Sequence, residues 1–283
     1  MGLIHQIDFT LTPPHGRATK ADARLIPNGQ PKPIVIFVHG FKGFKEWGYF
    51  NVLANYFAEK NFAFIKLNLS HNGSTLKEDD VLDLEAFGRN NFSIELDDVK
   101  ALLDLLHSDK SPVPEVEIDV QKISLIGHSR GGGLTILASA EDSRIKATAT
   151  WAAVSHLGRW SEEVLTKWQK EGVNYVANTR TKQQMPLYYQ LAEDYFANKA
   201  RFDVLAAAKQ MPQPLLIIHG NKDETVPVQM AFELKEVKPA AALEIIEEAN
   251  HTFGGTHPFT ASTLPEQAKL AADKTIQFFQ KFK

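Results

Sequence analysis

The sequence predicts an α/β fold, with a mostly parallel sheet of eight strands and helices on both of its faces. Short β-rich runs alternate with longer amphipathic stretches, which is the pattern of strands connected by helices. Some β-rich runs are apolar throughout, such as residues 34–38, as strands are when both faces of a sheet are covered. With 283 residues, 43% of them hydrophobic, the chain can bury a large core. We therefore expect residues 1–283 to form a single, doubly wound domain.

The expected strands and helices follow one another along the chain. Two opening strands, 4–11 and 19–26, are separated by the turn-forming sequence Pro13-Pro14-His15-Gly16. Later β-rich runs predict strands at 34–38, 62–69, 122–126, 145–154, 215–218 and 243–246. The amphipathic stretches between them predict helices at 50–60, 92–107, 131–140, 228–237 and 265–282.

Residues 155–214 interrupt this alternation, because they contain no run typical of a strand. Helical segments fit at 161–171, 181–197 and 201–209, so we expect residues 155–209 to form a helical cap after the sixth strand. The segment holds two of the four Trp and four of the six Tyr residues. These side chains either pack the segment onto the body or line a substrate pocket, and the candidates for the second role are Trp160, Tyr188 and Tyr189.

Composition and charge argue against several kinds of partner and site. Lys and Arg number 31 against 34 Asp and Glu, a formal charge of −3, and no basic run suits nucleic acid. The chain has no cysteine, which excludes disulfides and thiolate metal ligands. The first residues lack the features of a secretory signal, and no apolar run is long enough to span a membrane. We expect a cytoplasmic protein that binds neither membrane nor nucleic acid.

The sequence Gly127-His128-Ser129-Arg130-Gly131 is the strongest indication of chemistry in the chain. It follows the expected strand 122–126 and precedes the expected helix 131–140. A serine hydroxyl is a weak nucleophile at neutral pH, so it must be displayed on a tight strand-to-helix turn where a base can reach it. Such a turn forces close backbone contacts, which require glycine two residues before and after the serine. The motif therefore predicts that Ser129 is a catalytic nucleophile.

At these residues the chain resembles the α/β-hydrolase family, and the resemblance covers nearly its whole length. In that family the nucleophile follows the fifth strand, an acid follows the seventh, and a histidine follows the last. Residues 219–227 match the family's acid loop at the glycine, the aspartate and Val-Pro, which implies that Asp223 is the acid. Residues 250–253 match the histidine loop, which implies that His251 is the base.

Each assignment has a competitor nearby. Glu224 adjoins Asp223, and Glu162 would serve if the acid followed the sixth strand. His257 lies in the same loop as His251 but farther from the strand, so spacing favours His251. No histidine pair has a metal-binding spacing such as HExxH, and we expect neither a metal nor a cofactor.

An acyl-transfer site also needs hydrogen-bond donors for the oxyanion of the tetrahedral intermediate. The sequence His39-Gly40-Phe41-Lys42-Gly43 directly follows the third expected strand, where the family has its oxyanion loop. The resemblance implies that the backbone N–H groups of Phe41 and Arg130 are the two donors.

Within the superfamily, the chain most resembles the dienelactone-hydrolase-like and cinnamoyl-esterase-like serine hydrolases. The His-Gly-Phe loop, the Gly-His-Ser-Arg-Gly-Gly elbow and the segment after the sixth strand carry this resemblance. True dienelactone hydrolases have a cysteine nucleophile, so dienelactone is not the expected substrate. The resemblance implies a cofactor-free serine hydrolase that cleaves small carboxylic esters through an acyl-enzyme.

Two other functions stay open. An aminopeptidase of this fold would share the triad and would bind its substrate's amine with an acid of the cap, for which the candidates are Glu162, Glu163, Glu193 and Asp194. A non-catalytic receptor would use the same pocket, although it needs no intact triad. The sequence predicts neither the acyl and alcohol groups of the substrate nor the oligomeric state.

Overall fold

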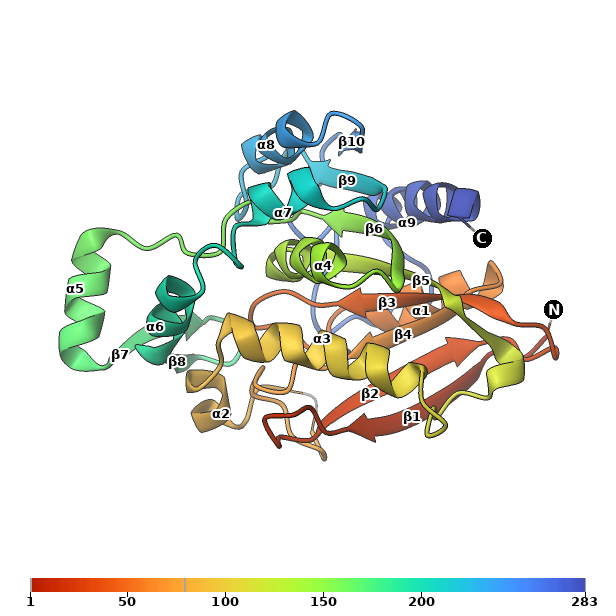
Figure 1. Ribbon diagram of the computed structural model, residues 1–283, viewed down its shortest axis with the longest axis horizontal. Coiled ribbons are helices and arrows are strands. Elements are labelled where there is room, and N and C mark those ends of the chain that lie inside the picture. The colour runs from red at the N-terminus through yellow and green to blue at the C-terminus, as the bar shows by residue number, and fades with distance from the viewer. Residues whose placement is uncertain (1, 79, 283) are drawn as a thin grey trace.

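The computed structural model describes residues 2–78 and 80–282, and an eight-stranded sheet forms its centre (Figure 1). The strands of this sheet are β1 (His5–Leu11), β2 (Thr19–Leu25), β3 (Lys32–Val38), β4 (Ala63–Leu67), β5 (Ile118–His128), β6 (Ile145–Trp151), β9 (Leu215–Gly220) and β10 (Ala242–Ile246). They lie in the order β1-β2-β4-β3-β5-β6-β9-β10. Strand β2 is antiparallel to β1 and β4, and the other neighbours are parallel. The predicted α/β fold is confirmed.

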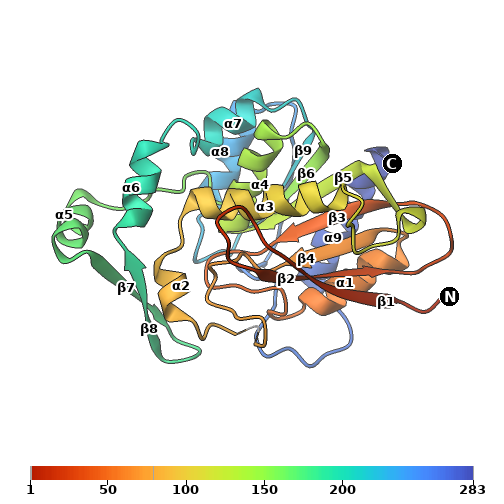
Figure 2. The same cartoon turned by 60° about the horizontal axis from the view of Figure 1, so that its bottom comes forward.

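Helices cover both faces of this sheet, as Figures 1 and 2 show. One face carries α1 (Phe50–Glu59) and α9 (Glu266–Phe279). The opposite face carries α3 (Phe92–Leu106), α4 (Arg130–Glu141), α7 (Val204–Gln210) and α8 (Gln229–Val237). In β3, Ile34 and Ile36 pack into the second layer and Phe37 into the first. A strand buried on both sides therefore needs a continuous apolar run.

The five helices predicted between the strands are all present, at α1, α3, α4, α8 and α9. Helix α2 (Leu84–Gly88) is not predicted, because five residues are too few to show a helical period. Its start is fixed by the Asp83 side chain, which accepts a hydrogen bond from the N–H of Ala86 at 3.0 Å. Short 3₁₀ turns lie at Glu115–Glu117 and Gln280–Phe282. No helix in the described ranges is long and apolar enough to cross a membrane.

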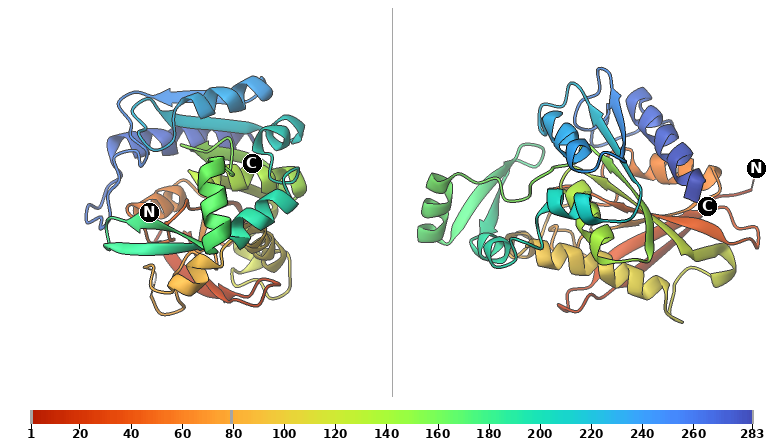
Figure 3. Two further views of the ribbon diagram at one scale, coloured as in Figure 1. Left: turned by 90° about the vertical axis from the view of Figure 1, so that its left-hand side faces the viewer. Right: turned by 45° about the horizontal axis from the view of Figure 1, so that its top comes forward.

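The segment between β6 and β9 differs from the predicted helical cap (Figure 3). Before α7 it contains α5 (Glu162–Glu171), β7 (Val173–Asn178), β8 (Gln183–Tyr188) and α6 (Gln190–Ala197). Strands β7 and β8 form an antiparallel hairpin, so the expected absence of strands here is wrong. The helix expected over 181–197 covers only the part from Gln190. Pro186 is the signal against it, because proline disrupts a helix interior but is tolerated in a strand at an edge.

The carboxyl ends of the parallel strands meet at one edge of the sheet, which is where α/β proteins bind ligands. Strands β5 and β9 end there at His128 and Gly220. The turn of the β7–β8 hairpin reaches the same edge. Its Arg180 donates to both oxygens of Asp80, in the connection after β4, at 2.5 and 2.8 Å. The hairpin is thereby tied to the body beside the predicted site.

Candidate active site

Ser129 lies at the sharp turn between β5 and α4. Its φ of +57° and ψ of −120° are rare for a residue other than glycine. A Cβ atom at Gly127 would lie 2.2 Å from the backbone oxygen of Gly131, and one at Gly131 would lie 2.3 Å from that of Val38. Both positions therefore require glycine, as predicted from the sequence. The turn presents the Ser129 side chain at the carboxyl edge of the sheet.

His251 and Asp223 form a hydrogen-bonded pair in the loops after β10 and β9. The Nδ1 atom of His251 lies 2.8 Å from Oδ2 of Asp223. The other carboxylate oxygen accepts hydrogen bonds from the N–H groups of Thr225 and Val226, both at 2.8 Å. Burial alone would raise the pKa of Asp223, but these contacts and one from His219 hold it well below its usual range. An ionised Asp223 requires the proton of neutral His251 on Nδ1, which leaves Nε2 free to accept one.

Two buried histidines support this pair. The Nε2 atom of His128 donates to the backbone oxygen of His251 at 2.8 Å and so holds the loop that carries it. Burial and the nearby His251 lower the pKa of His128 to about 3, which keeps the ring uncharged. The Nε2 atom of His219 lies 2.9 Å from the backbone oxygen of Val226 and 3.3 Å from Oδ2 of Asp223. The role of His128 cannot be found from spacing, because it depends on a contact with a loop far away in sequence.

The loop after β3 is fixed by a buried histidine. The backbone oxygen of Gly40 accepts hydrogen bonds from Nδ1 of His39 at 2.9 Å and from the N–H of Gly43 at 3.0 Å. Burial lowers the pKa of His39 to about 4, and Nε2 of the neutral ring accepts from the N–H of Leu69 at 3.1 Å. Because a trans peptide directs its C=O and N–H oppositely, these contacts also orient the N–H of Phe41.

Both predicted oxyanion donors lie beside Ser129. A Cβ atom at Gly40 would lie 2.9 Å from Cβ of Ser129, so the loop after β3 is in close contact with the elbow. Arg130 is the first residue of α4, and its N–H is one of the helix-starting groups that have no partner within the helix. Phe41, Ser129 and Arg130 line one cavity. This arrangement is compatible with two backbone donors facing the same oxygen.

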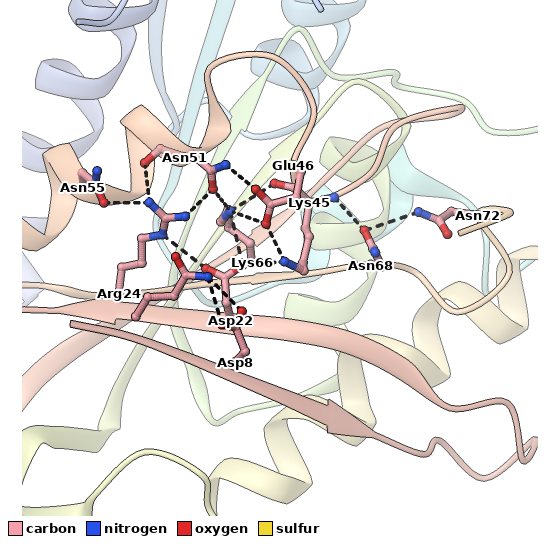
Figure 4. A network of polar contacts seen from close by, with 11 residues as sticks. Asp8, Asp22, Arg24, Lys45, Glu46, Asn51, Asn55, Lys66, Asn68 and Asn72 are labelled. Atoms are coloured by element: carbon pink, nitrogen blue, oxygen red, sulfur yellow. Dashed lines mark hydrogen bonds and ion pairs between the residues drawn. The ribbon is translucent and has the colours of Figure 1, made fainter. Parts of the chain in front are cut away.

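A buried polar network joins this loop to the sheet (Figure 4). Asp22, on β2, is fully buried and accepts a hydrogen bond from Nζ of Lys45 at 3.0 Å. The backbone N–H of Lys45 donates to the side chain of Asn68 at 2.6 Å, and the amide of Asn72 donates to the backbone oxygen of Gly43 at 3.1 Å. The network therefore fixes the position of the loop relative to the sheet.

Two adjoining cavities meet at Ser129, and both are lined by Phe41, Lys42 and His251. The hairpin cavity, of about 350 Å³, extends to Trp47, Phe50, His257 and the hairpin residues 178–180. The α4 cavity, of about 380 Å³, extends to Arg130, Leu157, Arg159, Thr225 and Val226. Ser129 and His251, the proposed nucleophile and base, thus line both cavities.

The three predicted substrate-binding aromatics lie outside both cavities. The ring of Trp160 is centred 5.3 Å from that of Trp168, and the ring of Tyr189 lies 5.8 Å from the same tryptophan. Tyr188 packs on α2, where its hydroxyl is hydrogen-bonded to Glu85. The sequence favoured a pocket role because the aromatic residues are concentrated in this segment, with packing of the segment onto the body as the alternative. In the hairpin it is the turn, and not the aromatic residues, that reaches the site.

The residues that compete with Asp223 and His251 for the roles of acid and base take no part in this hydrogen-bonded pair. Glu224 is exposed, and Glu162 is exposed at the start of α5. His257 lies in the hairpin cavity, but its Nδ1 accepts a hydrogen bond from the N–H of Gly48 at 2.9 Å and its ring stacks on Trp47. The structure thus brings His251, rather than His257, to Asp223. Within the described ranges, no group of three or more His, Asp or Glu side chains is arranged to hold a metal ion.

The sheet order and the serine elbow define the class of the α/β-hydrolases, and many solved structures share this fold. The chain belongs to the BD-FAE family, whose family model matches residues 25–237.

The chain is also similar to individual hydrolases. It is 27% identical over 153 residues to serine hydrolase BPHL of Mus musculus, which is 48% of this chain and half the length of that relative. It is 27% identical over 195 residues to YitV of Bacillus subtilis, to which an esterase activity is attributed, covering 69% of this chain and 70% of that protein. The structure of Est1E from Butyrivibrio proteoclasticus with bound ferulic acid shares the fold, with a TM-score of 0.66 and 17% identity over 99% of this chain and 96% of that one. These matches place the chain among hydrolases of the esterase type.

Proposed function

We propose that the protein hydrolyses small carboxylic esters through an acyl-enzyme, with Ser129 as nucleophile, His251 as base and Asp223 as the acid behind it. The observation that carries the proposal is the 2.8 Å contact between His251 and Asp223 beside a cavity that His251 shares with Ser129. A strained backbone at Ser129 supports it, because such strain is typical of functional sites.

The reaction follows from these positions. The Ser129 Oγ atom attacks the ester carbonyl while Nε2 of His251 takes the hydroxyl proton. The oxyanion accepts hydrogen bonds from the backbone N–H groups of Phe41 and Arg130. When the C–O bond of the ester breaks, the leaving alkoxide receives the proton from His251. Water, deprotonated by the same ring, then attacks the acyl-enzyme. The bond between the acyl carbon and Oγ of Ser129 breaks, the acid leaves, and His251 returns the proton to Ser129.

Charges near the site favour an ester over a peptide amine as substrate. An aminopeptidase needs a carboxylate that binds the substrate's ammonium group. Glu162, Glu163 and Glu193 are exposed, and Asp194 accepts hydrogen bonds from the N–H and hydroxyl of Ser93. None of the four lines either cavity at Ser129. A receptor function is disfavoured because binding alone requires no oriented base behind a strained serine.

The hairpin cavity supports an aromatic or similarly flat acyl group as the first substrate to test. Phe41, Trp47 and Phe50 line it, and apolar walls contribute about 0.8 kcal/mol for each methylene buried against them. The resemblance to a structure that binds ferulic acid agrees with this choice. We further propose that residues 155–209 act as a cap over the one catalytic domain, through the hairpin turn rather than through the predicted aromatics. A cytoplasmic location stays a prediction.

The test compares p-nitrophenyl esters with amino-acid p-nitroanilides, using the wild type and Ser129→Ala. We expect turnover of esters and none of anilides, and a loss of about 10⁴- to 10⁶-fold in kcat for the variant. Ser108→Ala, an exposed serine away from both cavities, is the matched control and should keep the wild-type rate. Faster cleavage of anilides than esters would favour the aminopeptidase, and an active Ser129→Ala would refute the nucleophile.

A further inference from the structure

The two cavities at Ser129 are lined by cations without a single carboxylate. Lys42 belongs to both cavities, Arg180 to the hairpin cavity, and Arg130 and Arg159 to the α4 cavity. Among the described residues that line them, none is Asp or Glu. The cavity walls are thus positively charged although the chain as a whole carries a formal charge of −3. Such a local field favours an anionic ligand.

Two of these cations are neutralised by carboxylates one layer behind the cavity wall. Arg180 forms its two hydrogen bonds with Asp80. Arg130 lies 3.4 Å from the buried Glu95 and stacks over the ring of Phe41 at 4.1 Å. The positive charges of Arg180 and Arg130 are therefore each paired with a carboxylate of the protein.

Among the residues that the structure describes, no carboxylate forms an ion pair with Lys42 or Arg159. The Nζ atom of Lys42 donates to the backbone oxygen of Ala177 at 3.2 Å, and its other contact is the face of Phe41 at 5.8 Å. The Nη1 atom of Arg159 lies 3.7 Å from the sulfur of Met230. Lys42 is half-buried, and an ammonium group with no opposite charge is unfavourable there.

The backbone at Lys42 gives a second, independent indication. Its φ is +61°, a region that disfavours most residues other than glycine. Glycine would relieve the strain but would remove the ammonium group that both cavities share. Burial lowers the pKa of Lys42, and an anion bound beside it would reverse that shift. Strain retained at a cavity wall is typical of a residue with a functional role.

We propose that Lys42 is a specificity-determining residue that binds a carboxylate carried by the ester substrate, with Arg159 assisting at the rim of the α4 cavity. The inference rests on the proposed ester hydrolysis and names its substrate class as anionic esters. Because Ser129 and Lys42 line both cavities, the pairing allows the carboxylate on either the acyl group or the alcohol of the ester.

Matched substrate pairs separate these two sources. For the acyl side, the pair is the p-nitrophenyl monoester of adipic acid and p-nitrophenyl hexanoate. For the alcohol side, it is p-acetoxybenzoate and p-acetoxybenzamide. In each pair one member carries a carboxylate and the other is neutral with a similar shape. The measurement is kcat/KM for all four compounds in the wild type, Lys42→Met, Lys42→Arg, Arg159→Met and the control Lys146→Met, which removes an exposed charge away from the site.

In one of the two pairs the wild type should prefer the anionic member by about tenfold, the scale of one charge-assisted hydrogen bond. Lys42→Met should abolish that preference, measured as the ratio of the two kcat/KM values, Lys42→Arg should restore part of it, and Arg159→Met should reduce it less. Added salt should weaken the preference in the wild type, and Lys146→Met should match the wild type. A wild type without anionic preference, or a preference unchanged in Lys42→Met, would overturn the inference while leaving ester hydrolysis intact. Failure to cleave any of the four compounds would refute the proposed function as well.

Discussion

At the scale of single residues, the proposed mechanism depends on which nitrogen of His251 carries the proton. Asp223 accepts from Nδ1 of His251, and its other oxygen is occupied by two backbone N–H groups. The carboxylate therefore cannot turn away, and Nε2 is left as the basic atom. Replacing the carboxylate by an amide would allow the opposite tautomer, whose Nε2 is already protonated and cannot act as a base.

Asp223→Asn should therefore lower kcat by about 10⁴-fold while leaving the fold in place. The measurement is steady-state hydrolysis of a p-nitrophenyl ester, beside the thermal midpoint of each protein. Glu224→Gln is the matched control, because this exposed neighbour contacts neither His251 nor the cavities. A larger loss in Glu224→Gln than in Asp223→Asn would show that the wrong acid was chosen.

The sequence predicts these residues because each lies in a short motif directly after a strand. Ser129 is indicated by its glycine-flanked turn, and the resemblance of two loops to those of the α/β-hydrolases implies Asp223 and His251. Lys42 and His128 stand in the same motifs, but their roles arise from what other loops bring to them. Such contacts have no signal in local sequence.

At the scale of elements, the segment between β6 and β9 divides packing and contact with the site between different residues. Its turn lines the hairpin cavity, whereas Trp160 packs against Trp168 outside it. The strands and helices of the body could be predicted because they are buried on regular faces. The hairpin could not, because its side chains are half-exposed and leave only a weak alternation.

Trp160→Ala should therefore change mainly the stability of the fold, and Arg180→Met mainly the preference among substrates. The first removes partly buried aromatic packing and should cost about 2 kcal/mol of unfolding free energy without reordering substrates. The second releases the hairpin turn from Asp80 and should change the ranking of substrates with little loss of stability, because exposed ion pairs contribute at most about 1 kcal/mol. The measurement is kcat/KM for acetyl, butyryl, octanoyl and cinnamoyl esters, beside urea unfolding. A changed ranking of the four esters by kcat/KM in Trp160→Ala would show that the aromatic residues take part in substrate recognition.

At the scale of the whole molecule, charge is distributed in a way that composition does not disclose. The formal charge of −3 describes a mildly acidic chain, yet cations gather at the cavities and a network around the buried Asp22 fixes the loop after β3. These pairings join residues that are distant in sequence, so only the folded chain reveals them. Lys42 and Arg159, which form no ion pair with another described residue, leave the cavities cationic. This excess of positive charge is the basis for expecting an anionic substrate.

The whole molecule also offers a competing serine. The Oγ atom of Ser70 lies 2.9 Å from Nδ1 of His71 and 3.2 Å from Nε2 of His15, and its N–H donates to the buried Asp98. Ser70 is buried and lines neither cavity at Ser129. A serine beside histidines is therefore not sufficient to identify the nucleophile, and the strained, cavity-facing turn at Ser129 is the feature that distinguishes it.

The most direct test of Ser129 as nucleophile is to map a fluorophosphonate adduct by mass spectrometry. The probe reacts with a serine that an adjacent base activates, so it reports the nucleophile without a choice of substrate. We predict one adduct per chain, on the peptide that contains Ser129, formed as ester hydrolysis is lost and absent from Ser129→Ala. An adduct on Ser70, or one that leaves hydrolysis unchanged, would contradict the proposed mechanism.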